Sequence, residues 1–467
     1  MKSYDVVNKV VYGVGIIRLE DLSKDYSEID FFSNRLESET ILIKIYDNIE
    51  SYFRVAEMYL TDRYCLREYM PLTGNEIISI RYRNSSHDPS VPEKIYHFFI
   101  VNIQEEQNTT ERDRGSTILK LSLVEAPIYY FLTTNSIYKT YKWDGGSKEK
   151  APEKEKTIYD IMIDTFSLIP HITKWYDFDI EETLEDLKIN FYIPNWTPYK
   201  TLNYLRKFAI NKENFPYFVC YVEPPEKIGK KPKIILKSIY SLMKKKGVHL
   251  FANQYANQTY RPPNSAQNPL DNLEEEKSDF DMTNVYNKRY FFYFNRTKTL
   301  FSKMSGETFF TFDYIHENKY IAYDFNDFRK KYRGLGQHFI HSMVYGNQWS
   351  KFRPHSFTEP KQLVSMKINE YAHQTLHSAI SCMLFMPVNE NRRIGQLADI
   401  LIKNPMKDIN IDLLFSGKWL IWGQIDILSV TFGDASSIVY CLKDGFERMS
   451  SDKGFVKMEH LQPPNNS

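Results

Sequence analysis

The chain has 467 residues, with 60 basic and 59 acidic side chains and a net charge of +1. This length accommodates about three domains of usual size, and the balanced charge argues against nucleic acid or an anionic membrane as the principal partner. Tyrosine and phenylalanine are frequent, at 34 and 31 residues, whereas glycine is scarce at 18. Such a composition favours half-buried β-strands over a glycine-rich nucleotide-binding fold.

Cysteine spacing and hydropathy indicate where the chain is made. The four cysteines are far apart and form no CxxC pair, so the sequence predicts neither a zinc module nor a disulfide framework. The amino terminus lacks the apolar core of a signal peptide, and the most apolar run, 379–388, has about half the roughly 20 residues needed to cross a bilayer. We expect a soluble chain made in a reducing compartment, without membrane insertion.

Residues 39–125 have the pattern of an antiparallel β-barrel or sandwich. The polar connection 104–116 suits the tip of a long hairpin, which serves either as a contact arm or as a solvated loop. The even spacing of short strand-like segments carries the prediction of a barrel. These segments are 41–46, 77–83, 95–103 and 117–125.

Residues 136–243 have the pattern of a mixed α/β domain. A charged segment, 142–156, marks a boundary or an exposed excursion. Thr157 then begins a helix that ends near Pro170, and strands are predicted at 217–223 and 233–240. The apolar side of this helix is predicted to comprise Ile158, Ile161, Met162 and Phe166.

Within this domain a strand, a turn and a capped helix are predicted in succession. Apolar residues alternate with polar ones from Leu187 to Ile193, the period of a strand with one buried face. Pro194 is expected to end the strand, because proline has no N–H to donate. Thr197 suits the N-cap and Pro198 the first helical position, although Lys200 stands where a capping box has an acid. The buried face of the helix is predicted to comprise Leu202, Leu205, Phe208 and Ala209.

The rest of the chain is polar at first and then β-rich. Residues 244–285 are expected to form a polar linker or an extended arm laid over another subunit. Two β-rich parts therefore flank an α/β middle, which suggests a duplicated barrel, although no sequence repeat is visible. The strands predicted in the second β-rich part are 289–294, 307–315, 363–368, 379–386, 394–402, 417–430 and 437–443.

Motifs for chemistry are weak, and we predict no catalytic, metal-binding or cofactor-binding residues. His373 and His377 have the spacing of a helical zinc pair, but the glutamate of a zinc protease is replaced by Gln374, and His338 with His341 is a looser pair. No GxSxG elbow is present. The remaining pairs are interpreted as solvent-exposed carboxylates, Asp177 with Asp179 and Asp279 with Asp281, and as turn glycines, Gly13 with Gly15 and Gly334 with Gly336.

Three pieces of the sequence together resemble the central hub subunit of the baseplate of contractile-tailed bacteriophages. They are IPNWTPYKTLNYLRKFAI at 193–210, the strand KIYHFFIVNI followed by LSLVEAP, and SGKWLIWG followed by CLKDGF. The first piece is the most specific, because such hubs have an Ile-Pro-Asn-Trp-Ser-Pro-like turn before a helix, and Thr197 takes the serine place here. The marker residues are Ile193, Pro194, Asn195, Trp196, Thr197, Pro198, Gly417, Lys418 and Gly445.

The resemblance implies a mainly β protein with an α/β insertion, an α+β fold. It implies a first tube-like antiparallel β-barrel at 1–135, the α/β domain at 136–243, and a second barrel with a spike-facing region at 286–467. Three subunits would form a ring of pseudo-sixfold symmetry with a polar, not strongly basic channel. The segments 142–156 and 244–285 depart from the family pattern. We expect Trp196 and Pro198 to fix the α/β domain against a barrel, so that Trp196→Ala costs about 3–5 kcal/mol if the ring is fully buried.

The implied function is structural and non-enzymatic. A hub of this family is a homotrimer that adapts the hexameric tail tube above it to the trimeric central spike or tail lysozyme below it. Baseplate wedge proteins surround the hub, and DNA passes transiently through its channel during genome delivery. The implied location is the tail baseplate of the virion, after synthesis in the host cytoplasm. Two alternatives are a hub component of a contractile injection or secretion machine and a hydrolase of cell-wall glycan.

Overall fold

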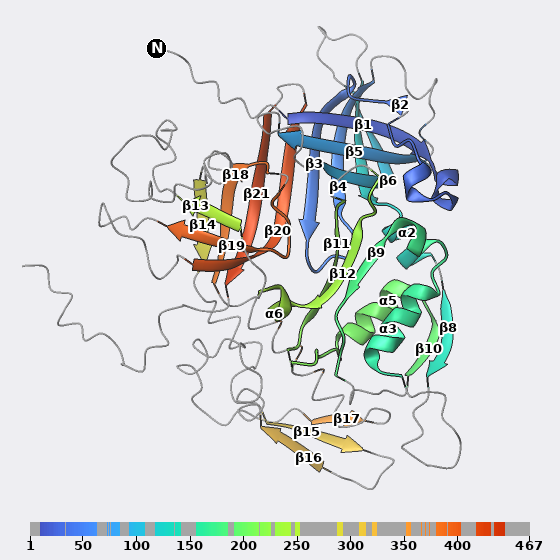
Figure 1. Cartoon of the computed structure of the whole chain (residues 1–467), viewed down its shortest axis with the longest axis vertical. Coiled ribbons are helices and arrows are strands. Elements are labelled where there is room, and N and C mark those ends of the chain that lie inside the picture. Colours follow the sequence, from blue (N-terminus) through green and yellow to red (C-terminus); the bar gives the residue numbers. More distant parts are fainter. Residues whose placement is uncertain are drawn as a thin grey trace, which may run out of the picture.

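The structure is a computed structural model in which a large β-sheet lies beside a smaller α/β part (Figure 1). The structure describes residues 10–62, 76–84, 93–107, 117–141, 156–184, 191–243, 248–252, 287–292, 308–313, 320–324, 352–355, 380–402, 417–430 and 434–443. Within these ranges residues 33, 135, 214, 226–228 and 390 are not described, and outside them Leu72, Gly74, Met366, Asn369 and His373 are described as well.

The large sheet has 13 strands and includes strands from both β-rich parts of the sequence. Its main path runs β14-β18-β21-β20-β3-β4-β7-β6-β5-β1-β2, and β13 joins it through β19, which pairs with β20. The amino-terminal strands are β1 (Val10–Arg18), β2 (Asn34–Arg35), β3 (Thr40–Asn48), β4 (Val55–Asp62), β5 (Glu76–Asn84), β6 (Lys94–Gln107) and β7 (Thr117–Glu125). The later strands are β13 (Val248–Ala252), β14 (Asn287–Phe292), β18 (Ile380–Pro387), β19 (Leu397–Ile402), β20 (Gly417–Ser429) and β21 (Asp434–Lys443).

The two β-rich parts meet where β3 pairs with β20. The pairing is antiparallel and runs from Gly423 opposite Asn48 to Ser429 opposite Leu42. Residues 375 to 387 positions apart thus become neighbours in one sheet. The division into barrels at 1–135 and 286–467 stays a prediction. Within the predicted polar segment 244–285, β13 is a strand, and residues 253–285 lie outside the described residues.

Most predicted strands are found, and the differences have physical causes. All four strands predicted in residues 1–135 are confirmed, whereas β1 and β4 were not predicted. The strand predicted at 363–368 is wrong at Met366, which is helical. The prediction of turns at Gly13 and Gly15 is also wrong, because both lie inside β1. A Cβ atom at Gly15 would lie 2.2 Å from the carbonyl oxygen of Phe31, so this strand needs glycine to let the neighbouring chain approach.

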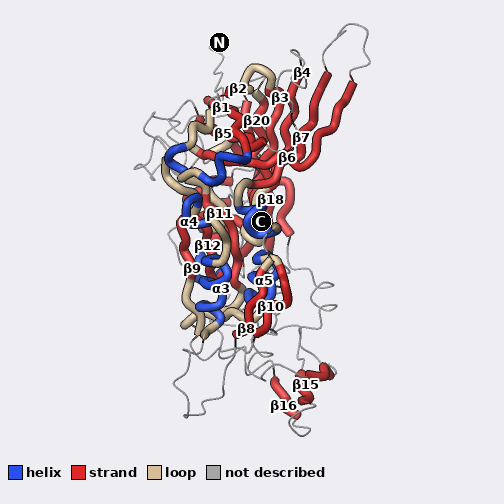
Figure 2. Tube along the Cα trace, turned by 90° about the vertical axis from the view of Figure 1, so that its right-hand side faces the viewer, coloured by secondary structure: helices blue, strands red, loops and turns tan. Residues whose placement is uncertain are grey.

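The α/β part places two helices between two small sheets, as both Figure 1 and Figure 2 show. One sheet pairs β9 in parallel with β12 and β12 antiparallel with β11, and the other pairs β8 with β10. Its elements are α2 (Ile128–Thr133), β8 (Ile137–Tyr141), α3 (Ile158–Ser167), α4 (Ile172–Trp175), β9 (Asp177–Ile180), β10 (Phe191–Trp196), α5 (Pro198–Arg206), β11 (Phe218–Glu223), β12 (Lys233–Ser238) and α6 (Ile239–Leu242). Short 3-10 turns lie at Leu19–Ser23 and Tyr26–Glu28, and a separate sheet contains β15 (Thr308–Asp313), β16 (Tyr320–Asp324) and β17 (Phe352–His355).

The predicted helix after Thr157 is confirmed as α3. Thr157 and Asp160 form a complete capping box, in which each side chain accepts from the other residue's backbone N–H. The predicted apolar side, Ile158, Ile161, Met162 and Phe166, is buried. No helix in the described part of the chain is long and apolar enough to cross a membrane.

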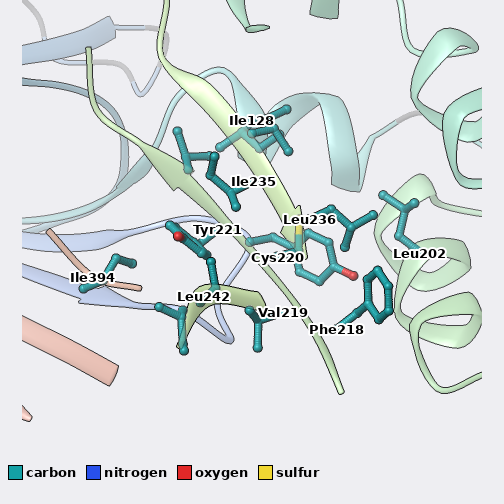
Figure 3. Close-up of a cluster of buried hydrophobic side chains, with 14 of the residues drawn as sticks. Ile128, Leu202, Phe218, Val219, Cys220, Tyr221, Ile235, Leu236, Leu242 and Ile394 are labelled. Atoms are coloured by element: carbon teal, nitrogen blue, oxygen red, sulfur yellow. The ribbon is translucent and has the colours of Figure 1, made fainter. Parts of the chain in front are cut away.

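One hydrophobic core continues from the α/β part into the large sheet. Figure 3 shows side chains of β11 and β12 between Leu202 of α5 and Ile394, which precedes β19. A second buried cluster lies among the amino-terminal strands, with Leu428 and Ala435 from β20 and β21. Because the same clusters contain residues from distant parts of the chain, these parts are packed as one body.

A buried histidine provides a pH test of this packing. The Nε2 of His97 lies 2.9 Å from the hydroxyl of Tyr26, its Nδ1 lies 2.8 Å from that of Ser79, and its ring stacks on Phe31 at 4.0 Å. Burial lowers the pKa of His97 from 6.5 to about 3. The neutral ring is therefore the form that the folded protein holds.

Because the folded pKa is below the unfolded pKa, His97 stabilises the fold fully above pH 6.5 and progressively less as the pH falls toward 3. We predict a loss of up to about 1.4 kcal/mol of unfolding free energy per pH unit in this window. His97→Gln should remove this part of the slope. Urea unfolding of both proteins between pH 7.5 and 4.5 measures it, and equal slopes would contradict the prediction.

Candidate assembly site

The marker stretch 193–198 forms a bulged strand end and a capped helix. The interpretation that Pro194 ends the strand is wrong, because β10 continues to Trp196. Ile193 pairs with Lys139 and Trp196 pairs with Ile137, so β10 has one more residue than β8 between these two pairs. The extra residue forms a β-bulge, which accommodates Pro194 although proline has no N–H to donate. Asn195 adopts φ 54°, a left-handed conformation that asparagine tolerates better than most residues.

The predicted start of α5 is confirmed. Thr197 accepts a hydrogen bond from the backbone N–H of Lys200, and Pro198 takes the first position. The capping box is incomplete, as predicted from Lys200, which occupies the position of the acidic residue. Along the helix and just after it, the predicted face is buried at Leu202, Leu205, Phe208 and Ala209.

Trp196 is half-buried. The cost of about 3–5 kcal/mol expected for Trp196→Ala applied to a fully buried ring and therefore does not apply here. Its ring packs edge-on against Tyr204 at 5.5 Å, and the ammonium of Lys200 lies 4.7 Å from its centroid. Contact with the amino-terminal β part is made by Tyr199, whose ring lies 5.2 Å from Tyr52 and 5.9 Å from Phe53. Sequence reasoning missed Tyr199, which lies next to the expected residues.

The later markers are placed only in part. Gly417 begins β20 opposite Ile400, and the exposed Lys418 lies opposite Asp399. Gly445 lies outside the described residues. The structure therefore brings the first six markers together around the start of α5 and places Gly417 and Lys418 at the beginning of a strand of the large sheet.

Arg54, between β3 and β4, joins three parts of the chain. Its Nε donates to Asp47 Oδ2 at 2.8 Å, its Nη1 to Glu125 Oε1 at 2.5 Å, and its Nη2 to the carbonyl oxygen of Val222 in β11. The guanidinium also lies 4.9 Å from the ring centroid of Tyr96. The side chain is only 2% exposed. We call Arg54, Asp47 and Glu125, with the Val222 carbonyl, the arginine junction.

Burial opposes the ionisation of the two carboxyl groups in the arginine junction. Burial raises the pKa of Glu125 to about 7, although Arg54 opposes this rise. Burial likewise raises the pKa of Asp47 against the effect of Arg54. Burial alone would lower the pKa of Arg54, but Asp47 and Glu125 raise it above its usual value. The guanidinium of Arg54 therefore stays protonated, and its charge favours the ionised forms of Asp47 and Glu125.

A second buried pair joins the amino-terminal strands to the last ones. Lys94 of β6 lies 3.3 Å from Asp426 Oδ2 in β20, and the Tyr82 hydroxyl donates to the same carboxylate. Gln424 donates to Asp426 Oδ1 at 2.5 Å, and Ser437 of β21 donates to that oxygen as well. Burial lowers the pKa of Lys94. Burial alone would raise the pKa of Asp426, but Lys94 and its other partners lower it.

Asp47 of the arginine junction and Lys94 of the second pair line one small cavity of about 10 Å³. Asp47, Lys94 and Gln424 line it from the large sheet, and Tyr221 and Glu223 line it from the α/β part. Arg393, just before β19, donates to Glu223 at 3.1 Å on its rim. The space suffices for about one water molecule. The arrangement positions chain segments and has no room for a substrate.

Two of the residues weighed as candidate catalytic or metal-binding groups form ordinary ion pairs. His373 lies 2.8 Å from Glu50, and Asp179 forms an ion pair with Lys237 at 2.6 Å. His377, His338, His341, Asp279 and Asp281 lie outside the described residues. Across the described ranges, no group of three or more histidine, cysteine, aspartate or glutamate residues is arranged to hold a metal ion.

The sequence pattern does indicate two members of these buried ion pairs, Glu125 and Lys94. Glu125 continues the buried alternation of Leu119, Leu121 and Leu123 in β7. Lys94 similarly precedes Tyr96 and Phe98 on one face of β6. A charged residue in phase with an apolar strand face requires a buried partner, and this rule points to both residues although it names neither partner.

Comparisons with known proteins identify the fold. No protein-family model and no curated protein matches the sequence. The chain is similar to the tail protein from Neisseria meningitidis MC58, with a TM-score of 0.50 and 11% identity over 93% of this chain and 97% of that chain. It is also similar to a chain of the half-lidded Francisella PdpA-VgrG complex, with a TM-score of 0.50 and 12% identity over 96% of this chain and 60% of that chain. The expected mainly β, hub-like α+β fold is confirmed.

We predict that Arg54→Met lowers the unfolding free energy by about 3–5 kcal/mol at pH 8, because it leaves two buried carboxyls without their cation. The loss should be smaller at pH 6. Because the pKa of Glu125 is about 7, its carboxyl is mostly protonated at that pH and does not need the charge of Arg54. Denaturant unfolding at both pH values measures it.

Two variants control this prediction. Lys24→Met removes the exposed ion pair with Asp21 and should change stability by no more than about 0.5 kcal/mol. Adding Glu125→Gln to Arg54→Met should restore part of the loss. If Arg54→Met costs no more than Lys24→Met, the arginine junction does not join the parts.

Proposed function

We propose that this chain is the structural hub of a contractile-tail baseplate, a homotrimer that adapts the hexameric tail tube to a trimeric central spike. The observation that supports this most is the fold shared with a tail protein over 93% of this chain. The marker motif 193–198 also supports the proposal, because Thr197 and Pro198 begin a capped helix directly after the Ile-Pro-Asn-Trp segment.

The geometry suits a part that transmits load between rings. A sheet that contains strands of both β-rich parts is held together by buried ion pairs and is joined to the α/β part by the hydrogen bond from Arg54 to the Val222 carbonyl, an arrangement that resists relative movement of these parts. Three copies with two related β regions each would offer six similar docking surfaces to a sixfold tube. Wedge proteins would surround this ring, DNA would pass through it, and the particle location would be the tail baseplate.

A second candidate is the corresponding hub of a contractile injection or secretion machine. The likeness to a chain of the PdpA-VgrG complex favours it, since that similarity covers 96% of this chain. The chain spans only 60% of the length of that relative, so the comparison supports the shared architecture and not the whole assembly. Both candidates are structural, and both require the same ring.

The test is the mass of the purified protein in solution, measured by light scattering across a range of concentrations. We predict a species three times the mass of the 55.4 kDa chain, which captures a separately purified spike protein. A stable monomer that lyses cell-wall glycan would contradict the proposal and support the hydrolase alternative. A trimer that binds a secretion-machine spike but no phage spike would favour the second candidate.

A further inference from the structure

Two buried cysteines face each other in the large sheet. Cys382 of β18 is the register partner of Cys441 of β21. The pairing on either side is regular, with Ser381 opposite Leu442 and Met383 opposite Tyr440. Directly opposed residues of an antiparallel pair also project to the same face. The two side chains therefore share one position across the ladder.

The backbone separation in such a pair suits a disulfide. Opposed Cα atoms in antiparallel strands are about 4.5–5.5 Å apart, and disulfides are found at Cα separations of about 4.4–6.8 Å. No register shift interrupts β18 and β21. A bond between the two sulfur atoms thus needs side-chain rotation and little backbone movement.

The surroundings keep the two thiols together and away from solvent. Cys382 is 2% and Cys441 is 0% exposed, in one core cluster with Leu384, Val439 and Ile421. After burial, the neighbouring Cys441 is the next cause of the raised pKa of Cys382. Burial raises the pKa of the Cys382 thiol, so little thiolate forms at neutral pH and reaction is slow.

We propose that Cys382 and Cys441 form a latent cross-strand disulfide, which a low-molecular-weight disulfide such as oxidised glutathione closes. The thiolate of one cysteine attacks the reagent disulfide and releases one glutathione thiolate. The other cysteine then attacks the mixed disulfide and releases the second. Two protein thiols are oxidised, one reagent disulfide is reduced to two thiols, and the two protons released from the protein balance the reaction.

The bond would tie β18 to β21 within the sheet that also contains β20 and β3. Its timing rests on the proposed function, since a tail protein leaves the reducing interior of its host when the particle is released. The pair would stay reduced during assembly and become linked afterwards. The chemistry of the pair itself does not depend on that setting, so failure of the trimer test would leave it intact.

The experiment incubates the folded full-length chain with oxidised glutathione at pH 7 and pH 9. We expect intact-mass analysis to show loss of two hydrogen atoms, faster at pH 9, and non-reducing peptide mapping to find the peptides of Cys382 and Cys441 linked. The midpoint of thermal unfolding should rise by several degrees and return after treatment with dithiothreitol.

Matched variants identify the bond. Cys382→Ala and Cys441→Ala should each abolish both the mass change and the thermal shift. Cys220→Ala, which changes another buried cysteine on β11, should keep both. Should the parent protein show only glutathione adducts on single cysteines, or a link through Cys220 or Cys65, the proposal is overturned. Because peptide mapping is done on the parent protein, the test stands even if an alanine variant does not fold.

Discussion

Arg54 donates to the carboxyl groups of Asp47 and Glu125 and to the Val222 carbonyl, and so connects the large sheet to the α/β part. A guanidinium presents several donors in a fixed plane, so it can hold three groups from different segments at once. Those segments are β3, β7 and β11, and β11 belongs to the α/β part. The position of the α/β part on the sheet is therefore set by directional bonds as well as by apolar packing.

Buried ion pairs are weak contributors to stability but strong determinants of arrangement. Removing two charges from water costs about as much as their attraction returns, while leaving one charge unpaired costs several kcal/mol more. The arginine junction and the Lys94–Asp426 pair thus penalise every arrangement in which β3, β6, β7 and β20 are not together. The ring subunit that we propose would benefit from a single arrangement of this kind.

Sequence patterns predicted local structure well and long-range joining poorly. Alternation identified β5, β6 and β7, and cap chemistry located the starts of α3 and α5, because these signals lie within a few residues of each other. The pairing of β3 with β20 joins residues about 380 positions apart and has no local signal. The bulge at Pro194 was missed for another reason, since the rule that proline ends a strand fails where an extra residue is accommodated. The arginine junction was missed because Glu125 and Val222 lie 71 and 168 residues from Arg54.

We propose that this sheet and the α/β part joined to it form the subunit of a ring. Electron microscopy of the purified protein tests this most directly, because end-on views show the symmetry without any partner. We expect class averages with threefold symmetry, six similar lobes and a central hole. Particles that remain single subunits at micromolar concentration, or rings without a central hole, would contradict it.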